Sequence, residues 1–303
     1  MTPISLRCEE LTKIYGSRSK PAVDGLSLVV NQGEIFTLLG RNGAGKTTFL
    51  RIAATQLLPT KGKIEVLGSD VVADPASIRP RIAVTPQEGK PLRPLTVWDH
   101  VYYWLLLRDM SRLEARVRTH RVLKSLELED FTKAQTMELS GGQKQKVLIA
   151  MAIATDAEFL FLDEPTLGLD PVSRRRVWTM ISELHHQNRT ILLTTHYLDE
   201  AEALSDRLAV LDEGKLIAEG SVEKLKGLLK ETTRIDFVTG FEEEELATYG
   251  RCMRVGDSLR VLTTEKLAAE LVQLALARRA RFRVSPTSLD DVFVSLVETG
   301  DMR

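Results

Sequence analysis

The sequence predicts an α/β fold in two domains, and three observations carry this prediction. Residues 147–211 alternate apolar helical and strand-like runs, a pattern typical of a largely parallel sheet covered by helices. A glycine-rich loop at residues 40–47 separates an apolar strand from a helix. The pattern changes again near Gly220, and a chain of 303 residues is long enough for roughly two domains.

The first domain is expected to span residues 1–220, with a helical region at about 88–150. Apolar and β-branched runs bounded by turn residues predict strands at Ile4–Cys8, Leu26–Val30, Glu34–Leu39, Lys63–Leu67, Arg81–Val84, Phe159–Leu162, Thr190–Thr194 and Leu208–Leu211. Apolar spacings of three and four predict helices at Lys46–Ala54, Val147–Ala154 and Val177–Leu184, and helical structure from Leu95 to Leu128.

The second domain is expected to span residues 221–303 as a small α+β unit. Its predicted helices are Val222–Lys230, Glu265–Arg278 and one that begins at Leu289; its predicted strands are Ile235–Thr239, Cys252–Val255, Leu259–Leu262 and Arg281–Val284. Ser288 and Asp291 fit a capping box at the start of the last helix. The segment contains no dense group of polar residues, so we expect a structural or partner-binding role.

Composition excludes several functional classes. The 41 Lys and Arg residues against 42 Asp and Glu residues leave no overall attraction for polyanions, so no nucleic-acid partner is expected. Cys8 and Cys252 stand alone, which excludes a disulfide framework or a structural zinc site and favours a reducing compartment. We expect no signal peptide, and no apolar run approaches the roughly 18 residues that span a bilayer. Any work at a membrane therefore needs a membrane-spanning partner.

The glycine-rich loop carries the strongest chemical signal. Residues Gly40 to Thr47 match Gly-x4-Gly-Lys-Ser/Thr, the phosphate-binding loop. Glycines allow successive backbone N–H groups to point at phosphate oxygens, and the following helix presents its positive end. Lys46 supplies a charge for the β- and γ-phosphates, and the Thr47 hydroxyl is a ligand for Mg²⁺. We therefore expect ATP and Mg²⁺ as cofactors.

A pair of acids ends a later apolar strand. Asp163 and Glu164 follow Phe159–Leu162, and a carboxylate at the tip of a strand beside a phosphate-binding loop can hold Mg²⁺. That is the role predicted for Asp163. The adjacent Glu164 can then act as the general base that polarises an attacking water.

The motif order resembles the ATPase subunits of ABC transporters. Leu139-Ser140-Gly141-Gly142-Gln143 lies between the phosphate-binding loop and the Asp-Glu-Pro-Thr segment, and the resemblance covers residues 1–220. It implies a P-loop NTPase core with an antiparallel β subdomain and a helical signature subdomain, followed by the small C-terminal domain. It also implies ATP hydrolysis coupled to transport across a membrane.

The resemblance also implies roles for particular residues. Tyr15 would stack on adenine, Gln87 would sense Mg²⁺ and the attacking water, and His196 would contact the γ-phosphate. Asp170 would bridge two ATP sites. The implied ATP contacts within one subunit are Tyr15, Gly40, Asn42, Gly43, Ala44, Gly45, Lys46, Thr47 and Thr48, and those from the opposite subunit are Ser140, Gly141, Gly142 and Gln143. Glu164, His196 and Gln87 would be catalytic, and Thr47, Gln87 and Asp163 would hold Mg²⁺.

The implied partners are a second ATPase subunit and an integral membrane permease. The second subunit would be an identical copy or a related chain. Residues of about 88–110, with Trp98, Tyr102, Tyr103 and Trp104, would form the groove for a cytoplasmic helix of the permease. The protein would then be cytoplasmic and peripheral on the inner face of the cell membrane. Residues 285–293 resemble the tails of exporter ATPases for drugs, antibiotics, polysaccharides or lipids.

Three alternatives remain open at the level of the sequence. The chain could be the ATPase of an importer, or a soluble ABC ATPase that acts on ribosomes or DNA. Ribosome-acting members usually fuse two cassettes, and this chain has one phosphate-binding loop. DNA-repair members insert a long coiled coil before the signature, and no sustained heptads occur here. A metabolic P-loop kinase would leave the Leu-Ser-Gly-Gly-Gln segment unexplained.

Overall fold

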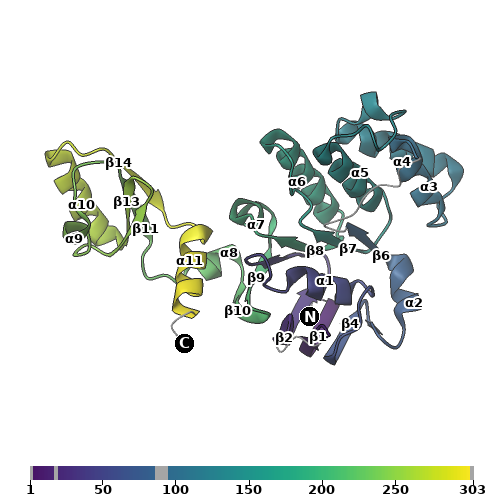
Figure 1. Ribbon diagram of the computed structural model, residues 1–303, viewed down its shortest axis with the longest axis horizontal. Helices are drawn as coiled ribbons and strands as arrows, with labels where there is room; N and C mark the ends of the chain where they lie inside the picture. The colour runs from purple at the N-terminus through teal and green to yellow at the C-terminus, as the bar shows by residue number, and fades with distance from the viewer. Residues whose placement is uncertain (1–2, 17–19, 86–94, 301–303) are drawn as a thin grey trace. The chain divides into compact units, whose positions relative to one another are not determined.

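A computed structural model describes residues 3–16, 20–85 and 95–300, with side chains through residue 296. Its contacts divide the chain into two compact units, Met1–Glu219 and Gly220–Arg303. Figure 1 shows the elements of both. Each unit is described separately below.

The first unit contains a six-stranded sheet with the order β10-β9-β3-β8-β7-β6. The strands are β3 (Ile35–Leu39), β6 (Ile82–Thr85), β7 (Phe159–Asp163), β8 (Thr190–Thr195), β9 (Arg207–Asp212) and β10 (Lys215–Gly220). The pairs β3/β8, β3/β9, β6/β7 and β7/β8 are parallel. The predicted parallel α/β core is therefore confirmed.

A second, antiparallel sheet pairs in the order β2-β1-β4-β5. Its strands are β1 (Ile4–Lys13), β2 (Val23–Asn31), β4 (Lys61–Val66) and β5 (Ser69–Asp70). Helix α1 (Lys46–Ala53) lies between the two sheets in Figure 1. A single apolar core joins them: it includes Phe49 of α1, Leu6 of β1 and the stacked rings of Phe159 and Phe161, whose centroids are 4.4 Å apart. The core fixes the glycine-rich loop at the start of α1.

The other face of the parallel sheet is covered by helices. These are α3 (Val97–Leu106), α4 (Arg112–Ser125), α5 (Gly141–Ile153), α6 (Pro171–His186) and α7 (Leu198–Leu204), and the shorter helices of this unit are α2 (Pro75–Ile78), η1 (Arg79–Arg81) and η2 (Glu129–Phe131). Leu160 and Leu162 enter the core on this face, whereas Phe159 and Phe161 enter the opposite core. This alternation follows from the two-residue period of a strand.

Three predicted helices have different bounds in the structure. The helical stretch from Leu95 to Leu128 is two helices, because the chain turns at Asp109, whose φ of 60° is left-handed. The helix predicted from Val147 begins at Gly141, where Ser140 is the N-cap. The helix predicted from Val177 begins at Pro171, after the N-cap Asp170. Polar caps extend both of these helices beyond their apolar stretches.

The second unit contains an antiparallel sheet with helices, and it has a strand or helix at each position where the sequence predicts one. Its elements are α8 (Val222–Lys226), β11 (Thr233–Phe237), α9 (Glu243–Leu246), β12 (Arg251–Val255), β13 (Ser258–Thr263), α10 (Glu265–Ala277), β14 (Phe282–Pro286) and α11 (Leu289–Gly300). The sheet order is β12-β13-β11-β14. The core of this unit contains Ile235 and Phe237 of β11 and Leu271 of α10. Helix α8 ends at Lys226 rather than Lys230, because Gly227 is its C-cap.

Candidate functional site

The glycine-rich loop connects β3 to α1, and its glycines are required by fit. A Cβ on Gly40 would lie 2.3 Å from the carbonyl oxygen of Leu211, and one on Gly45 would lie 2.2 Å from that of Ala22. Gly45 also has φ +98°, a conformation that only glycine adopts readily. The loop is thus pressed against two neighbouring backbones, which fixes the direction of its N–H groups.

Lys46 is a buried cation at the first position of α1, with 4% of its surface exposed. Its Nζ donates to the carbonyl oxygens of Gly40 at 2.7 Å and Arg41 at 3.1 Å, and lies 3.6 Å from Oε1 of Glu164. Burial lowers the pKa of Lys46, and the charge of Glu164 opposes that shift. The ammonium group is therefore held inside the loop, where a phosphate would meet it.

Asp163 ends β7 beside the hydroxyl of Thr47. Its Oδ1 accepts hydrogen bonds from Thr47 Oγ1 at 3.0 Å and from Thr194 Oγ1 at 2.6 Å. Burial raises the pKa of Asp163, while these two hydrogen bonds act in the opposite direction. Carboxylate and hydroxyl oxygens suit Mg²⁺, which typically takes one or two carboxylates plus substrate phosphates. The donor set present here therefore fits that ion.

Glu164 is held in an uncommon backbone conformation. Its φ is +46°, in the left-handed region, and its N–H donates to Thr194 at the carbonyl oxygen and at Oγ1. Its Oε2 lies 3.1 Å from Nδ1 of His196, and only 4% of the residue is exposed. A strained residue of this kind persists where its surroundings fix it, often at a functional site.

A cavity of about 280 Å³ brings Lys46, Thr47 and Glu164 together with Tyr15. It is lined by Tyr15, Ala22, Asn42, Gly43, Ala44, Gly45, Lys46, Thr47, Thr48 and Glu164. The Tyr15 hydroxyl lies 3.3 Å from Thr48 Oγ1, and Lys13 Nζ lies 5.5 Å from the centre of the Tyr15 ring. The structure thus brings most residues predicted for ATP contact within one subunit to one place.

The residues of the Leu-Ser-Gly-Gly-Gln signature, Leu139 to Gln143, do not line this cavity. Ser140 is the N-cap of α5 and forms a capping box with Gln143. Neither these two residues nor the intervening glycines, Gly141 and Gly142, line the cavity at the loop. Asp170 caps α6 by accepting from the N–H groups of Val172 and Ser173, and hydrogen bonds from Ser173 lower its pKa to about 2. Gln87 lies outside the described residues.

Some residues around the site carry no obvious sequence signal. Thr194 contacts Asp163 and the backbone of Glu164, yet in the sequence it is one more residue of an apolar strand. Ala22 lines the cavity from the segment before β2. Only the assembled sheet places these residues beside the motifs.

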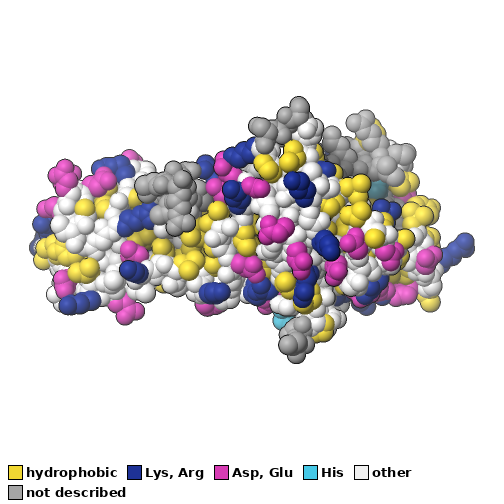
Figure 2. Space-filling view, turned by 90° about the horizontal axis from the view of Figure 1, so that it is seen from below, with side chains coloured by type: hydrophobic (Ala, Val, Ile, Leu, Met, Phe, Trp, Pro, Cys, Tyr) yellow, Lys and Arg dark blue, Asp and Glu magenta, His cyan; other side chains and the backbone are white. Residues whose placement is uncertain are grey.

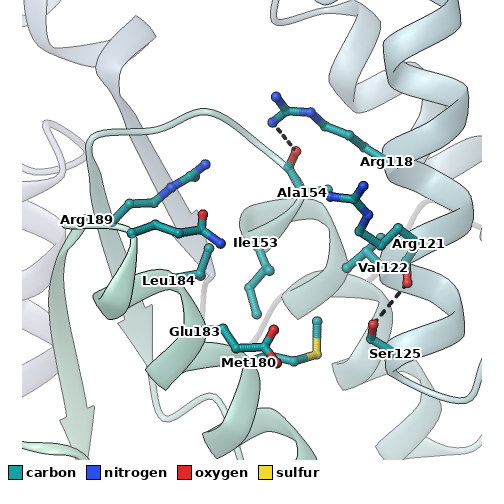
Figure 3. Close-up of a pocket in the computed structure, with 11 residues that line it drawn as sticks. Arg118, Arg121, Val122, Ser125, Ile153, Ala154, Met180, Glu183, Leu184 and Arg189 are labelled. Atoms are coloured by element: carbon teal, nitrogen blue, oxygen red, sulfur yellow. Dashed lines mark hydrogen bonds between the residues drawn. The ribbon is translucent and has the colours of Figure 1, made fainter.

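A further cavity, of about 230 Å³, lies among α4, α5 and α6 (Figure 3). Two of its three arginines have internal hydrogen-bond partners: Arg118 donates to the carbonyl oxygen of Ala154, as drawn in Figure 3, and to Asp156. Arg189 donates to the carbonyl oxygen of Thr155. These cations bind the carbonyl end of α5, an arrangement that stabilises the helix terminus.

Comparisons with known proteins agree with this geometry. The sequence profile of the ABC transporter family matches residues 23–167. The chain is 38% identical over 301 residues to the daunorubicin/doxorubicin resistance ATP-binding protein DrrA of Streptomyces peucetius, covering 94% of this chain and 90% of DrrA. It is 36% identical to the Nod factor export ATP-binding protein I of a Rhizobium species, covering 98% of both chains. The chain is an ATP-binding subunit of the ABC transporter family.

Solved structures support the same assignment. A dimeric ATP-binding cassette in a post-hydrolysis state, bound to ADP and Pi, matches with a TM-score of 0.66 and 27% identity over 71% of this chain and 98% of that one. This ABC subunit accordingly binds and hydrolyses ATP. Within the described residues, no helix has both the length and the apolar character needed to cross a bilayer.

Proposed function

We propose that two copies of this chain, or this chain and a related subunit, bind two ATP molecules between them and drive a separate membrane permease that exports its substrate. One observation carries the catalytic part of this proposal. Glu164, which lines the loop cavity together with Lys46, is in contact with the side chains of both Lys46 and His196.

In the proposed reaction the Glu164 carboxylate accepts a proton from the water that attacks the γ-phosphate. His196 orients that attack from the other side of Glu164, and Lys46 binds the β- and γ-phosphates. Thr47 and Asp163, together with Gln87, would hold Mg²⁺, which when bound offsets the negative charge of the phosphates. Tyr15, which lines the cavity, stacks on the adenine ring.

The signature residues are proposed to complete the site of the opposite subunit. Ser140 and Gly141 are exposed, and nothing lies within 4 Å of a Cβ added to Gly141. Packing within the chain therefore does not require glycine there, although glycine weakens a helix. Close approach of a phosphate to the start of α5 provides the missing reason, since helix N-termini bind anions.

The first test concerns Glu164. Glu164→Gln is expected to keep ATP affinity while kcat falls by about 10²- to 10⁴-fold, because the amide cannot accept the proton. It should also accumulate an ATP-bound dimer in size-exclusion chromatography. Lys46→Ala is the comparison variant and should weaken ATP binding itself. Near-normal hydrolysis by Glu164→Gln would refute the general-base role.

The second test concerns the composite site. Ser140→Arg and Lys46→Ala should each inactivate a homodimer, whereas a mixture should contain heterodimers with one intact site. Recovered ATPase activity in the mixture is expected. Absence of ATP-promoted dimers, even with Glu164→Gln, would favour a monomeric enzyme.

The permease is proposed to bind a groove between the sheet and α3. The groove has a volume of about 790 Å³, and its apolar lining includes Val84, Trp104 and Met151. Arg79 and Arg108 also line it, and among the described residues their side-chain hydrogen bonds go to hydroxyl and carbonyl oxygens, not to carboxylates. We expect an apolar helix that brings an acidic side chain to these cations.

Of the aromatic residues predicted for this surface, Tyr103 is 49% exposed, whereas Trp98 and Tyr102 pack against the core. Residues 88–94 of the predicted surface, Leu92 among them, lie outside the described part of the chain. A cysteine at Tyr103 should therefore cross-link to the permease. Cross-links confined to residues 222–303 would contradict this assignment.

Export is favoured over the alternatives by the relatives, which are named as resistance and export ATP-binding proteins. On the face seen in Figure 2, acidic and basic side chains are interspersed, which gives little support to a nucleic-acid surface. In this proposal the subunit is cytoplasmic and bound to the inner face of the membrane through the permease. Reconstitution with that permease, and measurement of the direction of ATP-driven transport, would test export against import.

A further inference from the structure

Glu200 is a fully buried carboxyl group close to the candidate site but outside its cavity. It lies in α7, four residues after His196, and has no exposed surface. Its Oε1 accepts two hydrogen bonds, from Thr166 Oγ1 at 2.8 Å and from Trp178 Nε1 at 2.9 Å. Among the described residues, no donor is in hydrogen-bonding geometry with its buried Oε2.

A buried carboxyl group with an unpaired oxygen lowers the stability of the folded protein, so stability does not explain why Glu200 is present. Burial raises the pKa of Glu200, which means that its ionised form is disfavoured inside the protein. Apolar residues of similar volume often replace a buried charged group without loss of stability. Neighbouring positions on the same side of α7 are apolar, namely Ala201 and Leu204. A carboxyl at this position therefore calls for a reason beyond packing.

The two donors show what the carboxyl connects. Thr166 lies two residues after Glu164. The carbonyl oxygen of the intervening Pro165 accepts a hydrogen bond of 3.0 Å from Nε2 of Gln145, which belongs to α5. Trp178 belongs to α6, the helix that Asp170 caps. Glu200 thus joins the segment after Glu164 to the helix that follows His196.

A second contact from α6 reaches the same segment. The guanidinium carbon of Arg174 lies 4.2 Å from the centre of the Tyr197 ring, and that ring lies 4.2 Å from the ring of His196. Arg174 also pairs with Asp199 at 3.4 Å. Tyr197 and Asp199, which both follow His196, are therefore in contact with α6.

We propose that Glu200 is a positioning residue that holds His196 against Glu164, acting through Thr166 and Trp178 and assisted by the stacking of Arg174 on Tyr197. Glu200 does not touch the nucleotide. Its hydrogen bonds set the separation between the two chain segments whose side chains meet at 3.1 Å. This inference rests on the proposed roles of Glu164 and His196.

The experiment measures kcat and ATP affinity in four variants. Glu200→Ala should lower kcat by about 10- to 100-fold, the effect of misplacing a catalytic group by about 1 Å, and should leave the Kd for ATP nearly unchanged. Thr166→Val removes only one hydroxyl and should lower kcat in the same direction. The double variant should lose little more than Glu200→Ala, because both changes break one connection. Glu200→Gln, which keeps an acceptor oxygen, should recover part of the activity.

Two further arms separate positioning from a general structural role. In a His196→Ala background, Glu200→Ala should cause no additional loss of kcat. Asp291→Asn is the matched control: Asp291 is a buried acid of the second unit that lies near Arg234 and Arg260, so its change should lower the melting temperature while kcat is retained.

Two results would overturn the inference. One is an unchanged kcat in both Glu200→Ala and Thr166→Val. The other is an equal fractional loss from Glu200→Ala with and without His196, which would indicate a structural effect only. A His196→Ala variant of normal activity would instead contradict the proposed function itself, so the two failures are distinguishable.

Discussion

Replacement of Gly141 by alanine should raise the melting temperature of the single subunit but prevent the formation of ATP-promoted dimers. Gly141 is the first residue of α5, is exposed, and does not have positive φ. A Cβ there would meet no atom within 4 Å. Within one subunit, therefore, alanine adds no clash and removes the conformational freedom that glycine has in the unfolded chain.

The expected gain follows from helix propensity. Alanine is favoured over glycine by up to about 1 kcal/mol in a helix, which corresponds to a rise in melting temperature of roughly 2–4 °C for a chain of this size. Gly45→Ala is the opposite case. Its φ of +98° and the 2.2 Å approach to the Ala22 carbonyl oxygen should make that variant less stable than the wild type.

Gly141→Ala should weaken ATP-promoted dimer formation, although it raises the melting temperature of the subunit. If α5 receives a phosphate from the opposite subunit, the added methyl group of Gly141→Ala separates backbone and ligand, and ATP-promoted dimers should be lost. Thermal melts give the first quantity, and size-exclusion chromatography with ATP in a Glu164→Gln background gives the second. A stabilised variant that still forms ATP-promoted dimers would refute the idea that Gly141 is required across the interface.

Three further predictions follow from the charges and the two units. Burial raises the pKa of Asp163, so ionisation of this carboxyl group destabilises the folded state at pH values above its ordinary pKa and not below it. Asp163→Asn should therefore have a higher melting temperature than wild type near pH 7, and this difference should vanish below about pH 4. The same variant should lack Mg²⁺-dependent ATPase activity. Hydrogen bonds lower the pKa of Asp170 to about 2, so the stability that its ionised form contributes is present above about pH 4 and is lost as the pH falls through 2. In acid titrations, the difference in unfolding free energy between wild type and Asp170→Ala should therefore shrink between about pH 4 and pH 2. Truncation after Gly220 should leave a folded unit that binds ATP, measured by calorimetry, and loss of affinity in a folded truncation would contradict the proposed division of roles.

The long, regular elements of the fold could be predicted from the sequence, and the short ones could not. Strand β7 is visible as an apolar run because both of its faces are buried. Helix α2 has only four residues, too few to show a period, although its Asp74 cap followed by proline is a readable start. Helix α9 also has four residues, three of them glutamates, so it resembles a polar loop in the sequence.

Some residues of the candidate site could likewise be predicted from the sequence, and others could not. Lys46, Asp163 and Glu164 are recognisable because their chemistry requires a fixed spacing along the chain. Thr194 and Glu200 are not, because their roles depend on which strand lies beside β7 and on which side of α7 packs inward. Glu200 stands among other acids in the sequence, and only its spacing with Ala201 and Leu204 marks it as buried.

The position of the signature gives the physical reason to expect a second subunit. Ser140 and Asp170 are satisfied locally, as N-caps of α5 and α6, and neither lines the loop cavity. One copy therefore offers ATP a charged loop on one side of the cavity and leaves the γ-phosphate without the helix N-terminus that could complete its coordination. The proposed role of Glu164 leads to the same requirement, because a general base is effective only when the attacking water is held in place. In the proposed dimer, a site closed by the signature of another copy would supply both requirements at once, and hydrolysis would then remove the phosphate that joins the two subunits. In this proposal ATP binding would close the pair and ATP hydrolysis would open it, and a permease bound at α3 would receive that motion.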